Sequence, residues 1–290
     1  EDVSRSVQRQ RYCGWQLCLA NSGNNDGTRN NAHKYEKNDA RILCKKLPAS
    51  ASLSSAAKEA IAMATGDYVD LLNHNDILNL NALYEMRQAI CEQQADFLYS
   101  DHITFQNDNL ADTTTVALKP DFAPDTLRSW NYIGSFVVFK RTLMDKVGEA
   151  FREEYDGSQV YDLILRLTEQ AGKIVHIAKI LYFVRAHATS GPADLRMTRS
   201  AQKAIASHLE RLGIPGKVEA APAVDNVYRI HYAIKGTPLV SIIIPNKDQV
   251  ETLAICIDSI LKKQPGQIMK LYCAKTTALN RRPLSITRNW

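Results

Sequence analysis

The sequence contains no long apolar run, and none of its segments reaches the roughly 18 uninterrupted apolar residues that a membrane-spanning helix needs. The first ten residues, EDVSRSVQRQ, also lack the apolar region of a signal peptide. We therefore expect no transmembrane segment and a cytoplasmic location, with a peripheral contact at the inner face of the membrane left open.

The sequence also lacks closely spaced pairs of cysteines. The six cysteines form no CxxC motif and show no regular spacing, and Cys18 and Cys44 lie inside apolar runs. A reduced cysteine in such a run acts as a small hydrophobic residue. The pattern argues against a disulfide framework or a zinc site and favours a reducing compartment.

The sequence also has no excess of positive charge outside its last 29 residues. The net charge is +5, but seven Lys or Arg and no acid lie from Lys262 onward, so residues 1–261 alone carry −2. A nucleic-acid-binding protein shows its excess positive charge on the folded surface. We therefore expect no nucleic-acid partner.

Short apolar runs typical of strands alternate with helical patterns. Strands are predicted at 15–20, 68–72, 96–100, 135–140 and 173–177, and helices at 54–65 and 81–94. This alternation predicts an α/β domain with a mostly parallel sheet. Ligands of such sheets bind at the carboxyl ends of strands, so residues 20–26 and 73–76 are candidate binding segments.

The pattern changes after about residue 190. A helix capped by Ser200 and ended by Gly213 is predicted, and then a strand at 226–234. A fully apolar strand at 238–246 and a helix at 249–262 resemble the start of another α/β domain. The predicted division is a first domain at 1–190, a helix-plus-strand connector at 191–236, the start of a second domain at 237–262 and a tail at 263–290.

Five motifs in order give the chain a resemblance to the family 2 glycosyltransferases of the GT-A fold. They are GWQLCLANSG (14–23), ATGDYVDLLNHND (64–76), LKPDFAPD (118–125), YDGSQVYDLILR (155–166) and IVHIAKILYFVRAH (174–187). The chain looks most like tandem bacterial enzymes of surface-polysaccharide synthesis. The resemblance implies an α/β fold of the GT-A type with a mostly parallel mixed sheet, and it covers residues 2–261 without the family's opening strand.

The resemblance also implies a reaction. A nucleotide-sugar donor binds at the strand ends, a divalent cation (Mg²⁺ or Mn²⁺) bridges its diphosphate, and a glycan or lipid-linked acceptor displaces the nucleotide. The positions that correspond to nucleotide contacts are Asn21, Ser22 and Asp76, and those that correspond to the metal site are Asn73, Asn75 and His187. The position of the catalytic base is Val160, with Asp162 next to it, and acceptor contacts correspond to Trp130 and Asn131.

The residues at these positions differ from the family in four carboxylates. Asn73 and Asn75 offer amide oxygens without the negative charge that helps to hold a dication, and Asn21 replaces a nucleotide-binding Asp. Val160 cannot accept a proton, and general-base assistance is typically worth about 10²–10⁴ in rate. We therefore expect inactive or impaired sugar transfer. The alternatives are a non-catalytic nucleotide- or glycan-binding module, and a working transferase that uses Asp76, His187 and an unconventional base.

Several neighbouring residues carry further expectations. Asp162 lies two residues after Val160 on a helix, hence about 200° around it, and is expected to face away. Asp70 falls in a strand that should be buried on both faces, where an unpaired carboxylate is costly. Trp130 is interpreted either as a sugar-stacking side chain or, more commonly for an aromatic residue, as part of the core.

Two hypotheses concern the end of the chain. If the reading frame moves back by one base near Lys262, permitted codons spell a string typical of the next part of a second family 2 domain, so residues 263–290 are predicted to be out-of-frame translation. Sequencing the source DNA tests this hypothesis. The second hypothesis is that 238–245, from this or a neighbouring chain, fills the place of the missing strand in the first sheet.

Overall fold

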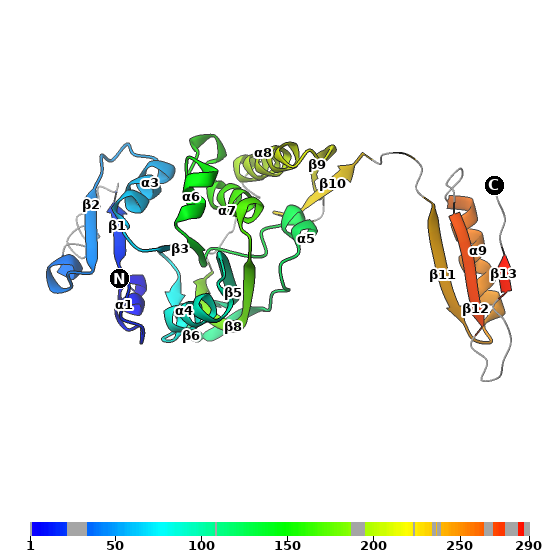
Figure 1. Cartoon of the computed structure of the whole chain (residues 1–290), viewed down its shortest axis with the longest axis horizontal. Helices are drawn as coiled ribbons and strands as arrows, with labels where there is room; N and C mark the ends of the chain where they lie inside the picture. The colour runs from blue at the N-terminus through cyan, green and yellow to red at the C-terminus, as the bar shows by residue number, and fades with distance from the viewer. Residues whose placement is uncertain are drawn as a thin grey trace. The chain divides into compact units, whose positions relative to one another are not determined.

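The structure is a computed structural model that describes residues 2–21, 34–107, 109–186, 195–222, 224–233, 236, 239–263, 269–275 and 284–286. The chain forms two compact units, Glu1–Tyr232 and Ala233–Trp290 (Figure 1). The two are called unit 1 and unit 2 below. No helix among the described residues is long and apolar enough to cross a bilayer.

Unit 1 contains most of the helices and strands. Its helices are α1 (Asp2–Gln8), α3 (Leu53–Met63), α4 (Ala82–Gln93), α5 (Pro124–Ser129), α6 (Thr142–Val147), α7 (Gln159–Gln170) and α8 (Leu195–Arg211), with a 3₁₀ turn at Glu153–Tyr155. Its strands are β1 (Leu17–Asn21), β2 (Ile42–Lys46), β3 (Tyr68–Leu71), β4 (Ile77–Leu78), β5 (Phe97–Gln106), β6 (Asn109–Ala117), β7 (Val137–Lys140), β8 (Ile174–Arg185), β9 (Gly216–Ala220) and β10 (Tyr228–Tyr232).

The main sheet has the strand order β3-β7-β5-β8-β4, and β6 pairs with β5. The long strands β5 and β8 run parallel, with Phe97 opposite Ile174. The other four pairs of this sheet are antiparallel, and β7 lies between β3 and β5 and runs against both. The expectation of an α/β fold with a mixed sheet is confirmed. The expectation that this sheet is mostly parallel is wrong, because β5–β8 is the one parallel pair among the five described pairs of the main sheet. The parallel pair β1–β2 forms a separate small sheet.

Both faces of the main sheet are covered, as the apolar strand patterns predict. Successive side chains of a strand point to opposite faces. Phe97 and Tyr99 of β5 therefore belong to the core beneath α7 and α8, whereas Leu98 belongs to the core on the α4 side. Figure 1 shows α6, α7 and α8 grouped on one side of β5 and β8, with α4 on the other.

Residues 195–232, most of the predicted connector, belong to unit 1. Helix α8 packs against α7, and β9 and β10 pair with each other beside α8 and α5. The prediction that a helix starts at Ser200 is wrong, since α8 begins at Leu195 and Ser200 is a buried residue inside it. The residues LRMTR before Ser200 extend the same helix by more than a turn, so Ser200 is not at its N-terminus.

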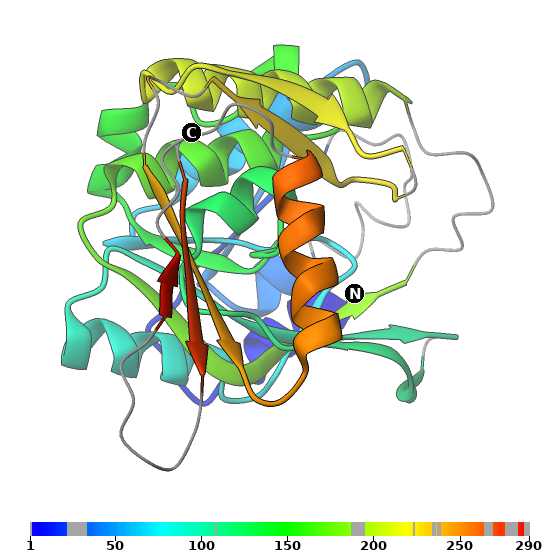
Figure 2. The same cartoon turned by 90° about the vertical axis from the view of Figure 1, so that its right-hand side faces the viewer.

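Unit 2 is a three-stranded sheet with one helix. Its elements are β11 (Val240–Asn246), α9 (Val250–Lys263), β12 (Met269–Lys275) and β13 (Leu284–Ile286). Figure 2 shows α9 along one face of this sheet. β11 pairs in parallel with β12 after the α9 crossover, as strands joined by a helix commonly do. The hypothesis that 238–245 fills a place in the first sheet is therefore wrong.

Candidate functional site

The loop 73–76 lies at the carboxyl end of β3, where the sequence predicted a binding segment. It is a tight turn in which the backbone N–H of Asp76 donates to the carbonyl of Asn73 at 3.0 Å. The N–H of Asn75 donates to Oδ1 of Asn73 at 3.2 Å. The structure thus brings Asn73, Asn75 and Asp76 together, with Asn73 exposed and Asp76 buried.

Asp76 points into the protein rather than out of the loop. Its side chain accepts a hydrogen bond of 2.5 Å from Oγ of Ser135, and the residue is only 1% exposed. Burial and the nearby Asp76 raise the pKa of Asp70 well above its usual range. Oδ1 of Asp70 is buried and finds no hydrogen-bond partner among the described residues. The strand thus leaves this carboxyl oxygen without a partner in the described part of the chain, and burial favours the protonated form of Asp70.

A buried lysine lies behind the loop. Nζ of Lys119 donates to the carbonyl of Ile133 at 2.6 Å and to Oη of Tyr182 at 3.1 Å. Burial lowers the pKa of Lys119 to about 7, against the opposing effect of Asp101 and Asp76. Lys119 thus holds together β8, the segment before β7 and the 118–125 motif. The sequence analysis noted that motif but did not assign its lysine.

Gly134 allows this arrangement because it takes up a backbone conformation and a space that other residues cannot. Its φ is +84°, and a Cβ at this position would come within 2.4 Å of Oη of Tyr182. The N–H of Gly134 donates to Oδ1 of Asn131 at 3.3 Å. Asn131, a predicted acceptor contact, therefore shapes the loop that carries Ser135.

A second buried group of polar residues lies in the middle of β5 and β8. Oδ1 of Asp101 contacts Nε2 of His176 at 2.8 Å and accepts from the N–H of Lys119 at 2.9 Å. The ring of Tyr99 stacks on His176 with the centroids 5.0 Å apart. Burial, together with the positive charge of Lys119, lowers the pKa of His102 to about 4. His102 is therefore neutral near pH 7.

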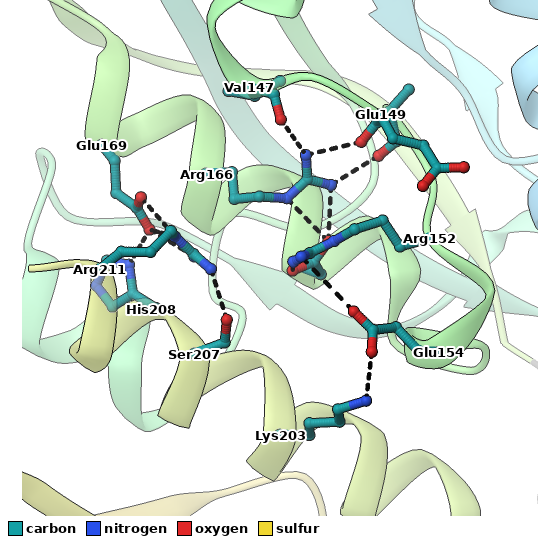
Figure 3. Close-up of polar contacts among 12 residues, drawn as sticks. Val147, Glu149, Arg152, Glu154, Arg166, Glu169, Lys203, Ser207, His208 and Arg211 are labelled. Carbon is teal, nitrogen blue, oxygen red and sulfur yellow. Dashed lines mark hydrogen bonds and ion pairs between the residues drawn. The ribbon is translucent and has the colours of Figure 1, made fainter.

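The predicted base position lies on α7. Val160 is partly buried and packs against the core. Asp162 is fully buried, and it accepts from Nε and Nη2 of Arg166 at 3.0 and 2.7 Å. It also pairs with Arg152. Figure 3 shows Arg166 and Arg152 side by side in this group of polar residues. Because both guanidinium groups bind it, Asp162 has a structural role in this arrangement and is not exposed to a substrate.

The remaining predicted residues are spread around the unit. Trp130 is 46% exposed, so the interpretation of it as a core residue is wrong, and its ring lies 6.3 Å from that of Tyr132. Asn21 ends β1, and its carbonyl accepts from the N–H of Leu47 at 2.9 Å. Ser22 and His187 lie outside the described residues.

The donor set at the loop does not fit a tightly held divalent cation. Asn73 and Asn75 are neutral, Oδ1 of Asn73 already caps the turn, and Ser135 binds the side chain of Asp76. No group of three or more His, Cys, Asp or Glu suited to a metal occurs within the described part of the chain. Family 2 enzymes generally use a divalent cation, which carboxylate oxygens hold best.

The mixed sheet with polar loops at its strand ends is a glycosyltransferase fold of the GT-A type. The crystal structure of S. aureus TarS 1–349 in complex with UDP-GlcNAc superimposes on it with a TM-score of 0.59, at 14% identity over 71% of this chain and 61% of that chain. The sequence profile described as "Glycosyl transferase family 2" matches residues 1–148. The chain belongs to glycosyl transferase family 2.

Curated relatives agree with this membership. The chain is 34% identical to the protein named "Uncharacterized protein y4gI" of Sinorhizobium fredii, over 90% of this chain and 29% of the relative. It is 32% identical to the O-antigen biosynthesis protein RfbC of Myxococcus xanthus, over 88% of this chain and 20% of the relative. The chain thus spans less than a third of the length of these two proteins.

Proposed function

We propose that unit 1 is the nucleotide-sugar-binding domain of a glycosyltransferase of polysaccharide biosynthesis in which sugar transfer is lost or strongly impaired. The observation that carries the proposal is the loop 73–76. It keeps the position of a donor site at the end of β3, yet its one carboxylate, Asp76, is buried against Ser135. The loop therefore offers a nucleotide hydrogen-bonding groups without a strong cation site.

The acceptor side supports the same proposal. Val160 carries no proton acceptor, and Asp162 on the same helix is enclosed by Arg152 and Arg166. A missing general base removes a factor of about 10²–10⁴ in rate. The exposed ring of Trp130 still offers a surface on which a sugar can stack.

Calorimetric titration with UDP, GDP and dTDP, each with and without Mn²⁺, tests the donor site. We expect weak nucleotide binding that Mn²⁺ does not strengthen. The double variant Asn73→Asp/Asn75→Asp should make binding depend on Mn²⁺, whereas Asn79→Asp, which adds a charge further along the chain, should not. Mn²⁺-dependent binding by the unchanged chain would contradict the proposal.

Transfer is tested separately with a panel of nucleotide-sugars. Adding Val160→Asp to the double variant should raise the rate of sugar transfer or of donor hydrolysis by about 10²–10⁴, because a general base is restored. If the unchanged chain transfers sugar as fast as the triple variant, the proposal that its transfer is lost or impaired is refuted.

A non-catalytic nucleotide- or glycan-binding module is the second candidate. The exposed Trp130 and the amide-rich loop favour it, since stacking and neutral hydrogen bonds bind sugars without catalysis. Saturable binding of a nucleotide or a glycan, with no transfer even after Val160→Asp, distinguishes it from the first.

A further inference from the structure

A cavity of about 490 Å³ lies where α1 meets β4, β6 and β8, outside the loop 73–76. Its wall combines three arginines with several apolar side chains, chiefly Arg5, Arg9, Arg11, Leu80, Leu110 and Phe183. The end of α1 is fixed against the chain that forms the floor, because the N–H of Arg11 donates to the carbonyl of Leu80 at 3.1 Å. In addition, Nε2 of Gln10 donates to the carbonyl of Asn79 at 2.7 Å.

The charge of the wall is strongly positive. Asp2 is the one acid among the lining residues, and its carboxylate is bound by Arg185 at 2.8 Å. Arg9 and Arg11 are exposed, and neither pairs with a carboxylate within the described part of the chain. Guanidinium groups suit phosphate oxygens, which they can bind with two parallel hydrogen bonds.

The apolar part of the wall is open to solvent. Leu80, between β4 and α4, is 50% exposed, and Leu110 of β6 is 43% exposed; both line the same cavity. Phe183 of β8 adds an aromatic side chain to the same wall. A ligand with only an anionic group would leave these side chains in water, whereas a ligand with an apolar body attached to its anion would cover them.

We propose that this cavity binds the phosphate of an anionic phospholipid and attaches unit 1 to the surface of a bilayer. Arg9 and Arg11 contact the phosphate, and the glycerol and upper acyl region lies on Leu80 and Leu110. The floor, residues 77–81, directly follows the loop 73–76 along the chain. Attachment here therefore keeps the donor loop close to the membrane surface.

Co-sedimentation with vesicles tests the proposal without any enzymatic readout. The protein is mixed with vesicles of phosphatidylcholine, with and without phosphatidylglycerol, and the bound fraction is measured. We expect binding only when phosphatidylglycerol is present. The double variant Arg9→Gln/Arg11→Gln should weaken it about 25-fold, since each basic side chain beside an anionic bilayer contributes on the order of fivefold.

Matched controls separate this site from other effects. Arg199→Gln/Arg229→Gln removes two exposed arginines elsewhere in unit 1 and should leave binding within twofold, whereas Leu110→Ser should weaken it. Circular dichroism melting of each variant checks that it is folded. An equal loss in the control pair would overturn the proposal, because it would indicate general charge attraction.

Two further outcomes would also overturn it. If the unchanged protein does not bind phosphatidylglycerol vesicles, the cavity is not a lipid site. If inorganic phosphate or glycerol phosphate at millimolar concentration displaces the vesicles and Leu110→Ser has no effect, the cavity is a site for soluble phosphates. Because none of these readouts involves nucleotide binding or transfer, their failure is distinct from a failure of the proposed function.

Discussion

Replacing Asp162 by Asn tests whether this residue has a structural role. The substitution keeps the size of the side chain and removes its charge. Asp162 has no exposed side-chain surface, and the side chain of Arg166 is 6% exposed. Nη1 of Arg166 donates to the carbonyls of Val147 and Glu149, and its Nη2 donates to that of Ala150, so the guanidinium cannot turn to solvent without breaking these bonds (Figure 3).

The expected loss is large because the substitution leaves buried positive charge without its partner. Breaking a buried ion pair by removing one member typically costs about 3–5 kcal/mol. The second guanidinium, Arg152, is 24% exposed and can be partly solvated, which favours the lower end of this range. For a unit of this size a loss of about 3 kcal/mol lowers the melting temperature by roughly 6–12 °C.

Thermal and urea unfolding, followed by circular dichroism, measure this loss. Glu149→Gln is the matched control, because Glu149 is 55% exposed and pairs with Lys58 at the surface. Surface pairs contribute at most about 1 kcal/mol. If Asp162→Asn unfolds within about 1 kcal/mol of the unchanged protein, the buried pairing is not what holds α7, and the structural assignment of Asp162 is refuted.

Three other substitutions test the site behind the loop. Gly134→Ala should lose about 1–3 kcal/mol by melting, from its left-handed backbone and the clash with Tyr182, whereas Gly148→Ala, at φ +73° with open space around it, should lose only the backbone part. Because folding lowers the pKa of His102 to about 4, this histidine takes up a proton at a higher pH in the unfolded chain than in the folded protein. The protein should therefore lose about 2 kcal/mol between pH 7 and pH 5, and His102→Phe should remove most of that loss. Folding lowers the pKa of Lys119 to about 7, so this lysine keeps its proton to a higher pH in the unfolded chain than in the folded protein. The free energy of unfolding should thus rise by up to about 1.4 kcal/mol per pH unit between pH 7 and pH 10, and this rise should be absent in Lys119→Met. If the pH dependence of unfolding is unchanged in His102→Phe or in Lys119→Met, the lowered pKa of that residue is contradicted.

Apolar patterning was enough to predict several elements of unit 1, but it did not predict β2, β4, β6 or β9. The runs at 68–72, 96–100 and 173–177 correspond to β3, β5 and β8, because strands buried on both faces leave a continuous apolar signal. The place of β7 between β3 and β5 could not be predicted in this way. Strand order depends on long-range pairing, such as Val138 with both Asp70 and Leu98, which leaves no local trace.

The candidate site was predictable only in part. The loop 73–76 was located by its position after an apolar strand, and helix geometry predicted that Asp162 faces away from the position of Val160. The contact of Lys119 with Tyr182 joins residues 63 positions apart, and nothing near either residue indicates the other. The exposure of Trp130 was missed for the same kind of reason, since exposure depends on which elements pack around a residue. The reading frame of residues 263–290 stays a prediction that DNA sequencing tests.

The exposed apolar strand of unit 2 has a consequence for how the chain behaves in concentrated solution. Ile243 is 70% exposed and Val240 is 45% exposed on β11. The six residues from Leu239 to Ile244 contain no charge and no proline, a composition that favours stacking of identical strands from many copies into cross-β fibrils. A charged substitution at Ile243, such as Ile243→Lys, interrupts this run with a gatekeeper residue. We therefore expect these six residues of unit 2 to lower the concentration at which the chain stays dispersed, and Ile243→Lys to raise it.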